Sequence, residues 1–490
     1  MFDQNSRSVV IVLLILVWNG VGQEPSVPRI DHSIPCPIEI QGDVPNECAY
    51  LVVWENRTIK NRTIRLPFVR LKTNAKNPKP DPVLYTAGGP GVSSLRRARG
   101  SKYLKAYMVE RDFIVFEQRG TRYAKPSLLC PEVDQSIREV GAAGLKGKAA
   151  SKKRIEAVSL CRDRLIKSGV DLSAYDSKSS AEDIDDLRKV LGIKKLNLFG
   201  ISYSTRLMLN VMRSHPDGIR SVVLDSVLPP SVNWDETGID GVVRSLNLLF
   251  KRCKNDKLCS TKYPDLETVF YGLIKRLNKK PLRIPVVDKK SNESVEVEIN
   301  GSDIASIAYD ALNYPDAISG LPSRIYAISK GNLDSLGSFA ATKLSGDGFI
   351  WGMRYSVWCR EEMPFQDPDR IASQTKRYSR LKGFSIQPDF VEICRVWNVP
   401  PADPLENEPV VSDIPTLVLG GSYDPNTPPL WGKLVTENLS RSFFFEFPDM
   451  GHLINFNSGC GIGMIGSFFV DPSKAPDSTC IKKEKRVTFK

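Results

Sequence analysis

A single serine marks the point where an apolar run changes abruptly into a helical pattern. Ser202 lies in residues 200–204 (Gly-Ile-Ser-Tyr-Ser), after the apolar run 196–199 and before the helical stretch 205–213. A strand that turns sharply into a helix at such a sequence lifts the serine hydroxyl clear of the backbone. The first amides of the helix then point toward an anion that forms there. The sequence therefore predicts a nucleophile elbow on a parallel sheet.

A serine becomes a nucleophile when a neighbouring base, usually histidine, takes its proton, and this chain has three histidines. His32 lies in a proline-rich stretch near the start of the chain. His215 ends the helix that Ser202 begins, which places it roughly 15–20 Å from the elbow. His452 follows the apolar run 443–447, at the end of a late strand, where the loops of a parallel sheet gather. We therefore predict that His452 is the base.

The third member of such a triad is an acid that orients the histidine and stabilises its charged form. Asp424 lies in the loop after the apolar run 415–421. The chain order Ser202, Asp424, His452 is that of α/β-hydrolases. Asp225, which follows another strand-like run, is the alternative acid. Each residue alone also fits an ordinary turn or cap, but their order and their positions after strand-like runs favour a triad.

A glycine-rich loop follows the apolar run 82–86. Its residues 87–91 read Ala-Gly-Gly-Pro-Gly, and glycines let a backbone approach a substrate closely and turn its amides inward. Alone, this segment would fit an ordinary glycine turn. Beside an elbow, it predicts that the amides of Gly89 and Tyr203 form an oxyanion hole.

At this point the sequence resembles a known family, the secreted α/β-hydrolases of the tripeptidyl and prolyl aminopeptidase type. The resemblance runs from about residue 36 to residue 480. It implies an α/β-hydrolase core, a mostly parallel sheet flanked by helices, with an inserted and mainly helical cap. Seven short motifs carry it: residues 88–91 (Gly-Gly-Pro-Gly), 117–121 (Glu-Gln-Arg-Gly-Thr), 200–203 (Gly-Ile-Ser-Tyr), 359–362 (Cys-Arg-Glu-Glu), 394–397 (Cys-Arg-Val-Trp), 424–428 (Asp-Pro-Asn-Thr-Pro) and 451–452 (Gly-His).

The chain also departs from the family's pattern. Ser204 stands two residues after the nucleophile, where the family usually has glycine. Val92 replaces a frequent glycine, and residues 122–123 (Arg-Tyr) stand where Gly-x-Ser is common. Because a serine adds only a hydroxymethyl group, we expect a shifted elbow that still functions.

Two adjacent carboxylates, Glu361 and Glu362, fall in the segment that the resemblance places in the cap. An aminopeptidase must recognise a free α-ammonium group, and buried carboxylates are the usual means of holding such a cation. We predict that this pair recognises the substrate amine. A solvated acidic pair that contacts Arg354 or Arg360 is the alternative.

The chain of 490 residues, of which 41% are hydrophobic, is long enough for several domain-sized units. Residues 1–22 resemble a secretion signal, with an apolar run of about ten residues that is too short to span a membrane. We predict a first core segment at 23–230, a helical cap at 231–404 and a second core segment at 405–490. A capping box at 179–182 predicts the start of a helix that feeds the elbow strand.

Ten cysteines fit an exported protein, in which an even number favours disulfides over thiols. We predict pairing between sequence neighbours, because these close the smallest loops. A metal site is disfavoured by the absence of a C-x-x-C pair, and we expect neither a metal nor another cofactor. The cysteines are Cys36, Cys48, Cys130, Cys161, Cys253, Cys259, Cys359, Cys394, Cys460 and Cys480.

The net charge is +12, with its densest clusters at residues 96–99 (Arg-Arg-Ala-Arg), 146–154 and 482–486. No aromatic interleaving or nucleic-acid motif accompanies the charge, so we expect a solvated surface and no nucleic-acid partner. Attraction to anionic envelope or matrix polymers is the alternative.

Together these patterns predict a secreted or periplasmic serine hydrolase without a membrane span. Its substrates would be peptides, from whose N-termini it releases short peptides or proline. An esterase or lipase with the same triad is the first alternative. A non-catalytic binding protein on the same fold is the second, and Ser204 is the feature that favours it.

Overall fold

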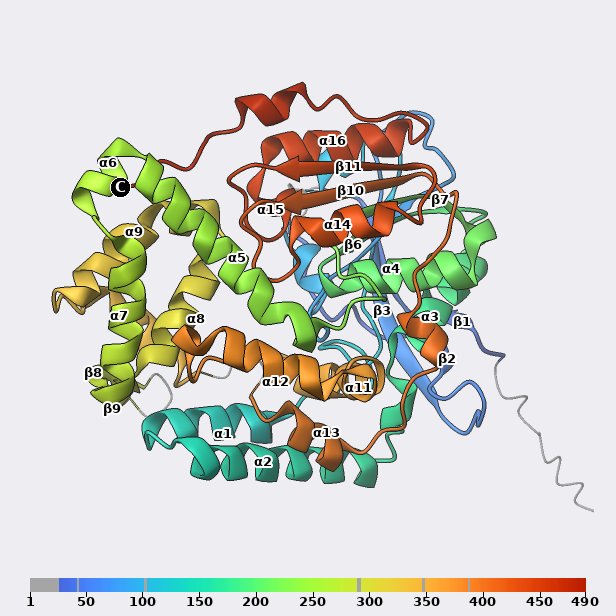
Figure 1. The fold of residues 1–490 in the computed structure, drawn as a ribbon. Coiled ribbons are helices and arrows are strands. Elements are labelled where there is room, and N and C mark those ends of the chain that lie inside the picture. Colours follow the sequence, from blue (N-terminus) through green and yellow to red (C-terminus); the bar gives the residue numbers. More distant parts are fainter. Residues whose placement is uncertain (1–25, 42–43, 101–103, 289–291, 346–348, 387) are drawn as a thin grey trace, which may run out of the picture.

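The computed structural model describes residues 26–41, 44–100, 104–288, 292–345, 349–386 and 388–490. The predicted secretion signal at residues 1–22 lies outside the described residues. The described chain forms a twisted sheet with helices on both faces and a broad helical layer at one end (Figure 1).

The large sheet is mostly parallel. From β5 to β11 neighbouring strands run parallel, whereas β1, β2 and β3 pair antiparallel with their neighbours. This arrangement confirms the predicted α/β class. In spatial order its strands are β1 (Arg29–Asp31), β2 (Asn46–Trp54), β3 (Thr63–Leu71), β5 (Phe113–Phe116), β4 (Val83–Thr86), β6 (Leu196–Ile201), β7 (Ile219–Asp225), β10 (Thr416–Gly421) and β11 (Ser442–Phe447).

Helices cover both faces of this sheet, which explains why its central strands read as unbroken apolar runs. Every residue of β4, β5 and β6 is buried. α3 (Ser177–Val190) and α4 (Tyr203–Ser214) pack on one face, and α16 (Gly459–Val470) packs on the other. α14 (Pro429–Thr436) lies beside β10 and β11.

α3 begins two residues before the predicted capping box. The N-cap is Asp176, whose carboxylate accepts a hydrogen bond from the amide of Ser179 at 2.7 Å. The helix therefore starts at Ser177, and Gly192, with φ 65°, follows its end. The predicted helix is confirmed, and its start is corrected.

A helical layer lies at the end of the sheet to which the β10 and β11 arrows point (Figure 1). The small hairpin of β8 (Leu282–Val287) and β9 (Ser294–Ile299) belongs to it. Its helices are α5 (Trp234–Asn255), α6 (Lys257–Lys262), α7 (Leu266–Lys279), α8 (Gly301–Ala311), α9 (Pro315–Ser329), α10 (Gly337–Thr342), α11 (Trp351–Glu361), α12 (Pro368–Arg377) and α13 (Phe390–Trp397).

Two earlier helices join this layer. α1 (Pro131–Ala142) packs on α2 (Gly147–Lys167), and α2 packs on α13. Two apolar clusters lie in the layer: one joins the helices from α5 to α10, and the other joins α11 and α13 to α1, α2 and the start of α4. The Arg162 Nε donates to the carbonyl of Trp397 at 3.1 Å, and the Ser151 hydroxyl donates to Asp389 at 2.8 Å. The cap predicted at 231–404 therefore leaves out α1 and α2.

Two further features bear on the compartment in which the chain folds. The cysteines form disulfides between sequence neighbours, as predicted: Cys36–Cys48, Cys130–Cys161, Cys253–Cys259, Cys359–Cys394 and Cys460–Cys480. Within the described ranges, no helix is both long and apolar enough to cross a membrane. The disulfides fit an oxidising compartment.

Candidate active site

Ser202 occupies a sharp turn between β6 and α4. Its backbone has φ 54° and ψ −129°, a conformation that is uncommon for a non-glycine residue and clusters at functional sites. The glycine-rich loop passes directly over this turn. A Cβ atom at Gly88 would lie 2.8 Å from the Cβ of Ser202 and 2.7 Å from the carbonyl oxygen of Ile201, so glycine is needed there.

Ser204, the departure from the family's glycine, is accommodated inside the elbow. Its side chain is fully buried, and its hydroxyl oxygen accepts a hydrogen bond from the amide of Ile201 at 2.7 Å. The same hydroxyl lies 2.8 Å from the carbonyl of Thr86, to which it donates. The extra hydroxyl therefore links the end of β4 to the elbow, while Ser202 keeps the positive φ of the turn.

His452 and Asp424 are in direct contact. The Nδ1 atom of His452 lies 2.7 Å from the Oδ2 atom of Asp424. Asp424 is fully buried and also accepts hydrogen bonds from the Thr427 hydroxyl at 2.7 Å and from the Asn426 amide at 2.8 Å. A carboxylate on Nδ1 holds the imidazole so that Nε2 is left to accept a proton.

The electrostatics of this pair follow from its contact. Burial alone would raise the pKa of Asp424, but the charge and hydrogen bond of His452 lower that pKa below its ordinary value. Burial alone would lower the pKa of His452, but Asp424 raises it above the ordinary value. Asp424 therefore stays ionised, and His452 is a stronger base than a free histidine.

Ser202 and His452 line the same hollow, which has a volume of about 460 Å³. Among the described residues no hydrogen bond joins the two side chains. Catalytic hydrogen bonds are often long in a ligand-free protein and shorten when substrate binds.

Asp225, the alternative acid, contacts the backbone that follows His452. Its buried carboxylate accepts hydrogen bonds from the amides of Ile454 at 3.0 Å and Asn455 at 2.8 Å. Burial raises its pKa to about 6. The structure thus brings Asp424 to the imidazole and uses Asp225 to hold the loop.

The other two histidines lie elsewhere. His215 follows α4, where its ring nitrogens are 3.1 Å from Glu182 and 3.3 Å from Asp185. His32 is exposed near the start of the described chain.

The two predicted oxyanion donors face this elbow from different elements. Tyr203 is the first residue of α4, so its amide has no partner within the helix. Gly89 has φ 115° in the loop that covers the elbow. The Nη1 atom of Arg354 in α11 donates to the carbonyl of Gly89 at 2.7 Å, and the amide of Ile350 donates to the carbonyl of Gly91 at 3.2 Å. The start of α11 therefore holds the glycine-rich loop.

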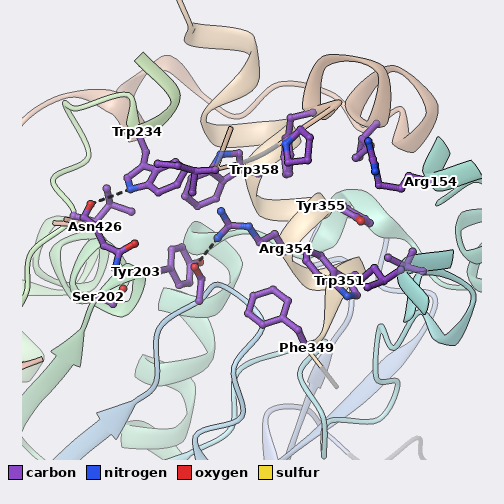
Figure 2. Close-up of a pocket in the computed structure, with 18 of the residues that line it drawn as sticks. Arg154, Ser202, Tyr203, Trp234, Phe349, Trp351, Arg354, Tyr355, Trp358 and Asn426 are labelled. Carbon is purple, nitrogen blue, oxygen red and sulfur yellow. Dashed lines mark hydrogen bonds between the residues drawn. The ribbon is translucent and has the colours of Figure 1, made fainter. Parts of the chain in front are cut away.

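A second cavity, of about 480 Å³, extends from Ser202 under the helical layer (Figure 2). The Arg354 guanidinium is 4.0 Å from the ring centroid of Trp358, and the Trp234 Nε1 donates to the Asn426 carbonyl at 3.0 Å. None of the described residues that line it is Asp or Glu. Its lining is mostly apolar and aromatic: Val133, Ile137, Leu228, Trp234, Tyr309, Phe349, Trp351, Tyr355, Trp358, Ile386, Pro388, Phe390 and Ile393, with Arg154 and Arg354 as the charged members.

Glu361 and Glu362 are fully buried, and neither lines this cavity. Glu361 accepts hydrogen bonds from the amide and hydroxyl of Ser177 at 2.6 and 2.7 Å. Glu362 accepts from the amide of Trp234 at 2.8 Å and forms an ion pair with Arg206. Burial raises the pKa of both carboxyls, that of Glu362 to about 7. The predicted contact with a substrate amine finds no support in this arrangement.

Sequence reasoning missed two members of the site. Thr427 contacts both members of the acid–base pair, with its hydroxyl 3.1 Å from the Nδ1 of His452, and the motif at 424–428 could have pointed to it. Arg354 was considered only as a partner of the glutamates. It contacts a loop that is 265 residues away in the chain. The sequence around Arg354 contains no pattern that predicts such a contact.

The chain is similar in sequence to proteins named as peptidases. Residues 383–480 match the family model described as TAP-like protein. The tripeptidyl aminopeptidase of Streptomyces lividans is 28% identical over 253 residues, which cover 49% of this chain and 44% of that protein. The chain thus matches less than half the length of that relative. Serine protease Hip1 of Mycobacterium tuberculosis is 23% identical over 411 residues, with 76% of this chain and 75% of that protein covered.

The crystal structure of proline iminopeptidase from Mycobacterium smegmatis matches 86% of this chain and 98% of that chain, with 11% identity and a TM-score of 0.37. Because the TM-score is low, we assign the fold from the strand order and not from this similarity.

The strand order and the helical layers define an α/β-hydrolase. More specifically, the chain is similar to TAP-like proteins over residues 383–480, and the resemblance inferred from its motifs is confirmed. The peptidase names of the relatives support a serine hydrolase or peptidase.

Proposed function

We propose that the protein hydrolyses acyl bonds through a triad of Ser202, His452 and Asp424. The observation that carries the proposal is the 2.7 Å contact between His452 and Asp424, with His452 and the elbow serine lining one hollow. His452 takes the proton of Ser202 as the hydroxyl attacks the substrate carbonyl, and Asp424 stabilises the imidazolium that forms. His452 then gives the proton to the leaving group.

The anion of the tetrahedral intermediate would be bound by the amides of Gly89 and Tyr203. Such donors act strongly because they are already oriented when the charge develops. The acyl-enzyme on Ser202 is released by water, which His452 activates in the same way. The chain's own residues therefore supply each step of the cycle.

We propose that the substrates are peptides, from whose N-termini the enzyme releases a short piece. The relatives named tripeptidyl aminopeptidase and serine protease support a peptide substrate. A cavity of about 480 Å³ beside Ser202 supports a small acyl portion, because sites of this size hold small ligands. We also propose that the protein is secreted or periplasmic, which its disulfides support.

An esterase with the same triad is the second candidate, and one observation favours it. The lining of the aromatic cavity contains no Asp or Glu among the described residues, so no carboxylate there would hold a free α-ammonium group. The non-catalytic alternative loses its main argument, because Ser204 fits inside the elbow.

Three substrates with the same acyl sequence separate these candidates: a peptide with a free amine, its N-acetylated form and an ester. For the peptidase we expect cleavage of the free-amine peptide at least tenfold faster, in kcat/KM, than cleavage of the acetylated peptide. Equal rates on the two peptides would remove the aminopeptidase assignment. Turnover of the ester alone would identify an esterase.

A further inference from the structure

Ser202 stands between two hollows that differ in chemistry. The aromatic cavity under the helical layer does not include His452 among its lining residues, whereas the hollow of about 460 Å³ does. The general acid must reach the leaving atom when the substrate bond breaks. The hollow that contains His452 is therefore the side from which the leaving group departs, and the aromatic cavity holds the acyl portion.

The leaving-group hollow is lined by the arginine cluster that the sequence singled out. Arg96 and Arg97 contribute to its wall, and none of its described lining residues is Asp or Glu. Arg97 lies over the ring of Phe456, 3.2 Å from the centroid. In the part of the chain that the structure describes, Arg96 has no ion-pair partner.

Two acidic groups lie near this segment, Glu117 and Asp225, whose charge acts on Tyr85, and neither lines the hollow. Glu117 is fully buried, and its carboxylate accepts hydrogen bonds from the Ser93 hydroxyl and the Leu95 amide, both at 3.0 Å. It also accepts from the amide of Tyr123 at 3.2 Å. Glu117 thus holds the buried side of the loop, while Arg96 and Arg97 are exposed.

A buried hydroxyl lies beside the arginines in this hollow. Tyr85 is 2% exposed and lines the same hollow as Arg97. Burial raises the pKa of Tyr85, and the charge of Arg97 and its hydrogen bond with the hydroxyl oppose this only in part, so the hydroxyl keeps its proton. Tyr85 therefore places a neutral hydroxyl next to the Arg97 guanidinium.

We propose that this hollow is a subsite for a carboxylate on the leaving portion of the substrate, recognised by Arg96 and Arg97 with the hydroxyl of Tyr85 beside them. Guanidinium groups bind carboxylates in a planar, often bidentate arrangement. The proposal rests on the proposed function, because it assigns the leaving side of the same reaction. The arginine cluster, which the sequence pattern predicts to be solvated surface, would then contribute to substrate specificity.

Two sources could supply the carboxylate: the C-terminus of a short leaving peptide or an acidic side chain within it. The test uses three peptides with one acyl sequence. The first has a leaving dipeptide with a free C-terminus, the second has the C-terminal amide, and the third has the amide with Asp in the leaving dipeptide. We expect wild-type kcat/KM for the free acid to exceed that for the neutral amide by roughly five- to tenfold, since the arginines are exposed.

The variant Arg96→Gln/Arg97→Gln should lose this preference, so that its kcat/KM for the free acid equals its own kcat/KM for the neutral amide. Arg99→Gln is the matched control: it removes one charge from the same segment, does not line the hollow, and should keep the preference. The preference should also shrink when salt is raised from 20 to about 300 mM, because salt screens exposed charges. Rescue of the neutral amide by Asp identifies a side chain as an accepted source, and its failure identifies the C-terminus.

Equal kcat/KM for all three peptides in the wild-type protein would overturn the subsite, as would a preference that survives in the double variant. The Ser202→Ala variant separates this failure from failure of the proposed function. If cleavage of the neutral amide depends on Ser202 but no acid preference exists, the subsite alone is refuted. If Ser202→Ala cleaves all three peptides as the wild type does, the triad itself is refuted.

Discussion

Two clusters of buried carboxylates lie near the elbow, and they differ in what they touch. Asp424 contacts His452, whose side chain is 14% exposed and reaches a hollow beside Ser202. Glu361 and Glu362 surround Arg206, whose side chain is 1% exposed, and line neither cavity at the serine.

The partner of each carboxylate decides what the cluster can do. The Asp424–His452 pair contains an imidazole, which exchanges protons near neutral pH. The second cluster contains an arginine, which keeps its charge and cannot shuttle a proton. Through Ser177 and Arg206 it instead fastens the end of α11 to α3 and α4. We therefore expect damage to the first cluster to lower the rate and damage to the second to lower stability.

The largest effect should follow loss of the base. His452→Ala should lower kcat about 10⁶-fold, as is typical when a triad member is removed. Adding Ser202→Ala should lower it little further, because the triad acts as a unit. The check is steady-state turnover of an ester and a peptide, with thermal unfolding as the folding control. Retention of more than about 1% of wild-type kcat would contradict the assignment.

Replacement of the acid should have the next largest effect. Asp424→Asn should lower kcat about 10⁴-fold, because the imidazole loses the anion that orients and stabilises it. Asp225→Asn should cost far less, since the hydrogen bonds that Asp225 accepts come from the backbone after His452 and from the Ser226 hydroxyl, whereas Asp424 is the carboxylate bonded to the imidazole. The reverse order of the two losses would make Asp225 the acid.

The pH dependence of kcat/KM tests the contact between His452 and Asp424 independently. His452 must be neutral to act as a base, and Asp424 raises its pKa above the ordinary value. Wild-type kcat/KM should therefore rise with pH through a midpoint above about 6.5, the ordinary histidine pKa. In Asp424→Asn that midpoint should move to lower pH, and an unchanged midpoint would show that Asp424 does not act on His452.

A smaller effect is expected at the oxyanion loop. Arg354→Met removes the hydrogen bond to the carbonyl of Gly89, a charge-assisted bond of a kind that contributes about 1.5–3 kcal/mol. We expect kcat to fall roughly tenfold or more on ester and peptide alike, because the loop that carries the Gly89 amide loosens. Arg154→Met is the matched control: Arg154 lines the same cavity but pairs with Asp389, so KM should change and kcat should not. Equal kcat in the Arg354 variant and the wild type would remove this positioning role.

The smallest change in rate should come from the second cluster. Glu361→Gln should lower the free energy of unfolding by about 1–3 kcal/mol, since it weakens buried hydrogen bonds to Ser177. Turnover of correctly folded protein should stay within about twofold on ester and peptide alike. Denaturant unfolding measures the loss, with the exposed Glu437→Gln as control. A rise in KM confined to free-amine peptides would instead restore Glu361 as an amine anchor.

The residues of the proposed triad could be placed from sequence because two of the strands that precede them are buried. β6 and β10 lie inside the sheet, are covered on both faces and read as apolar runs. Parallel strands gather the residues that follow them at one edge, so Ser202, Asp424 and His452 could be predicted to meet. The length of the helix that Ser202 begins excluded His215, and the motif at 424–428 favoured Asp424 over Asp225.

The contacts that could not be predicted depend on packing between distant segments. The sequences of α1 and α2 do not show that these helices join the helical layer. The pattern of an amphipathic helix indicates which face is buried, but not which element packs against that face. The adjacent glutamates at 361–362 were placed in the cap, but their enclosure by Arg206 depends on how α11 meets α4. For the same reason, the sequence does not distinguish a pair of glutamates in a buried ion-pair cluster from a pair that lines a cavity and binds the substrate.

Labelling with a fluorophosphonate tests the central claim most directly. The probe reacts with a serine only when a base and an oxyanion hole activate it. We predict stoichiometric labelling of the wild-type protein at Ser202, identified by peptide mass mapping, and no labelling of His452→Ala under the same conditions. Labelling at another serine, or equal labelling of the two proteins, would contradict the triad.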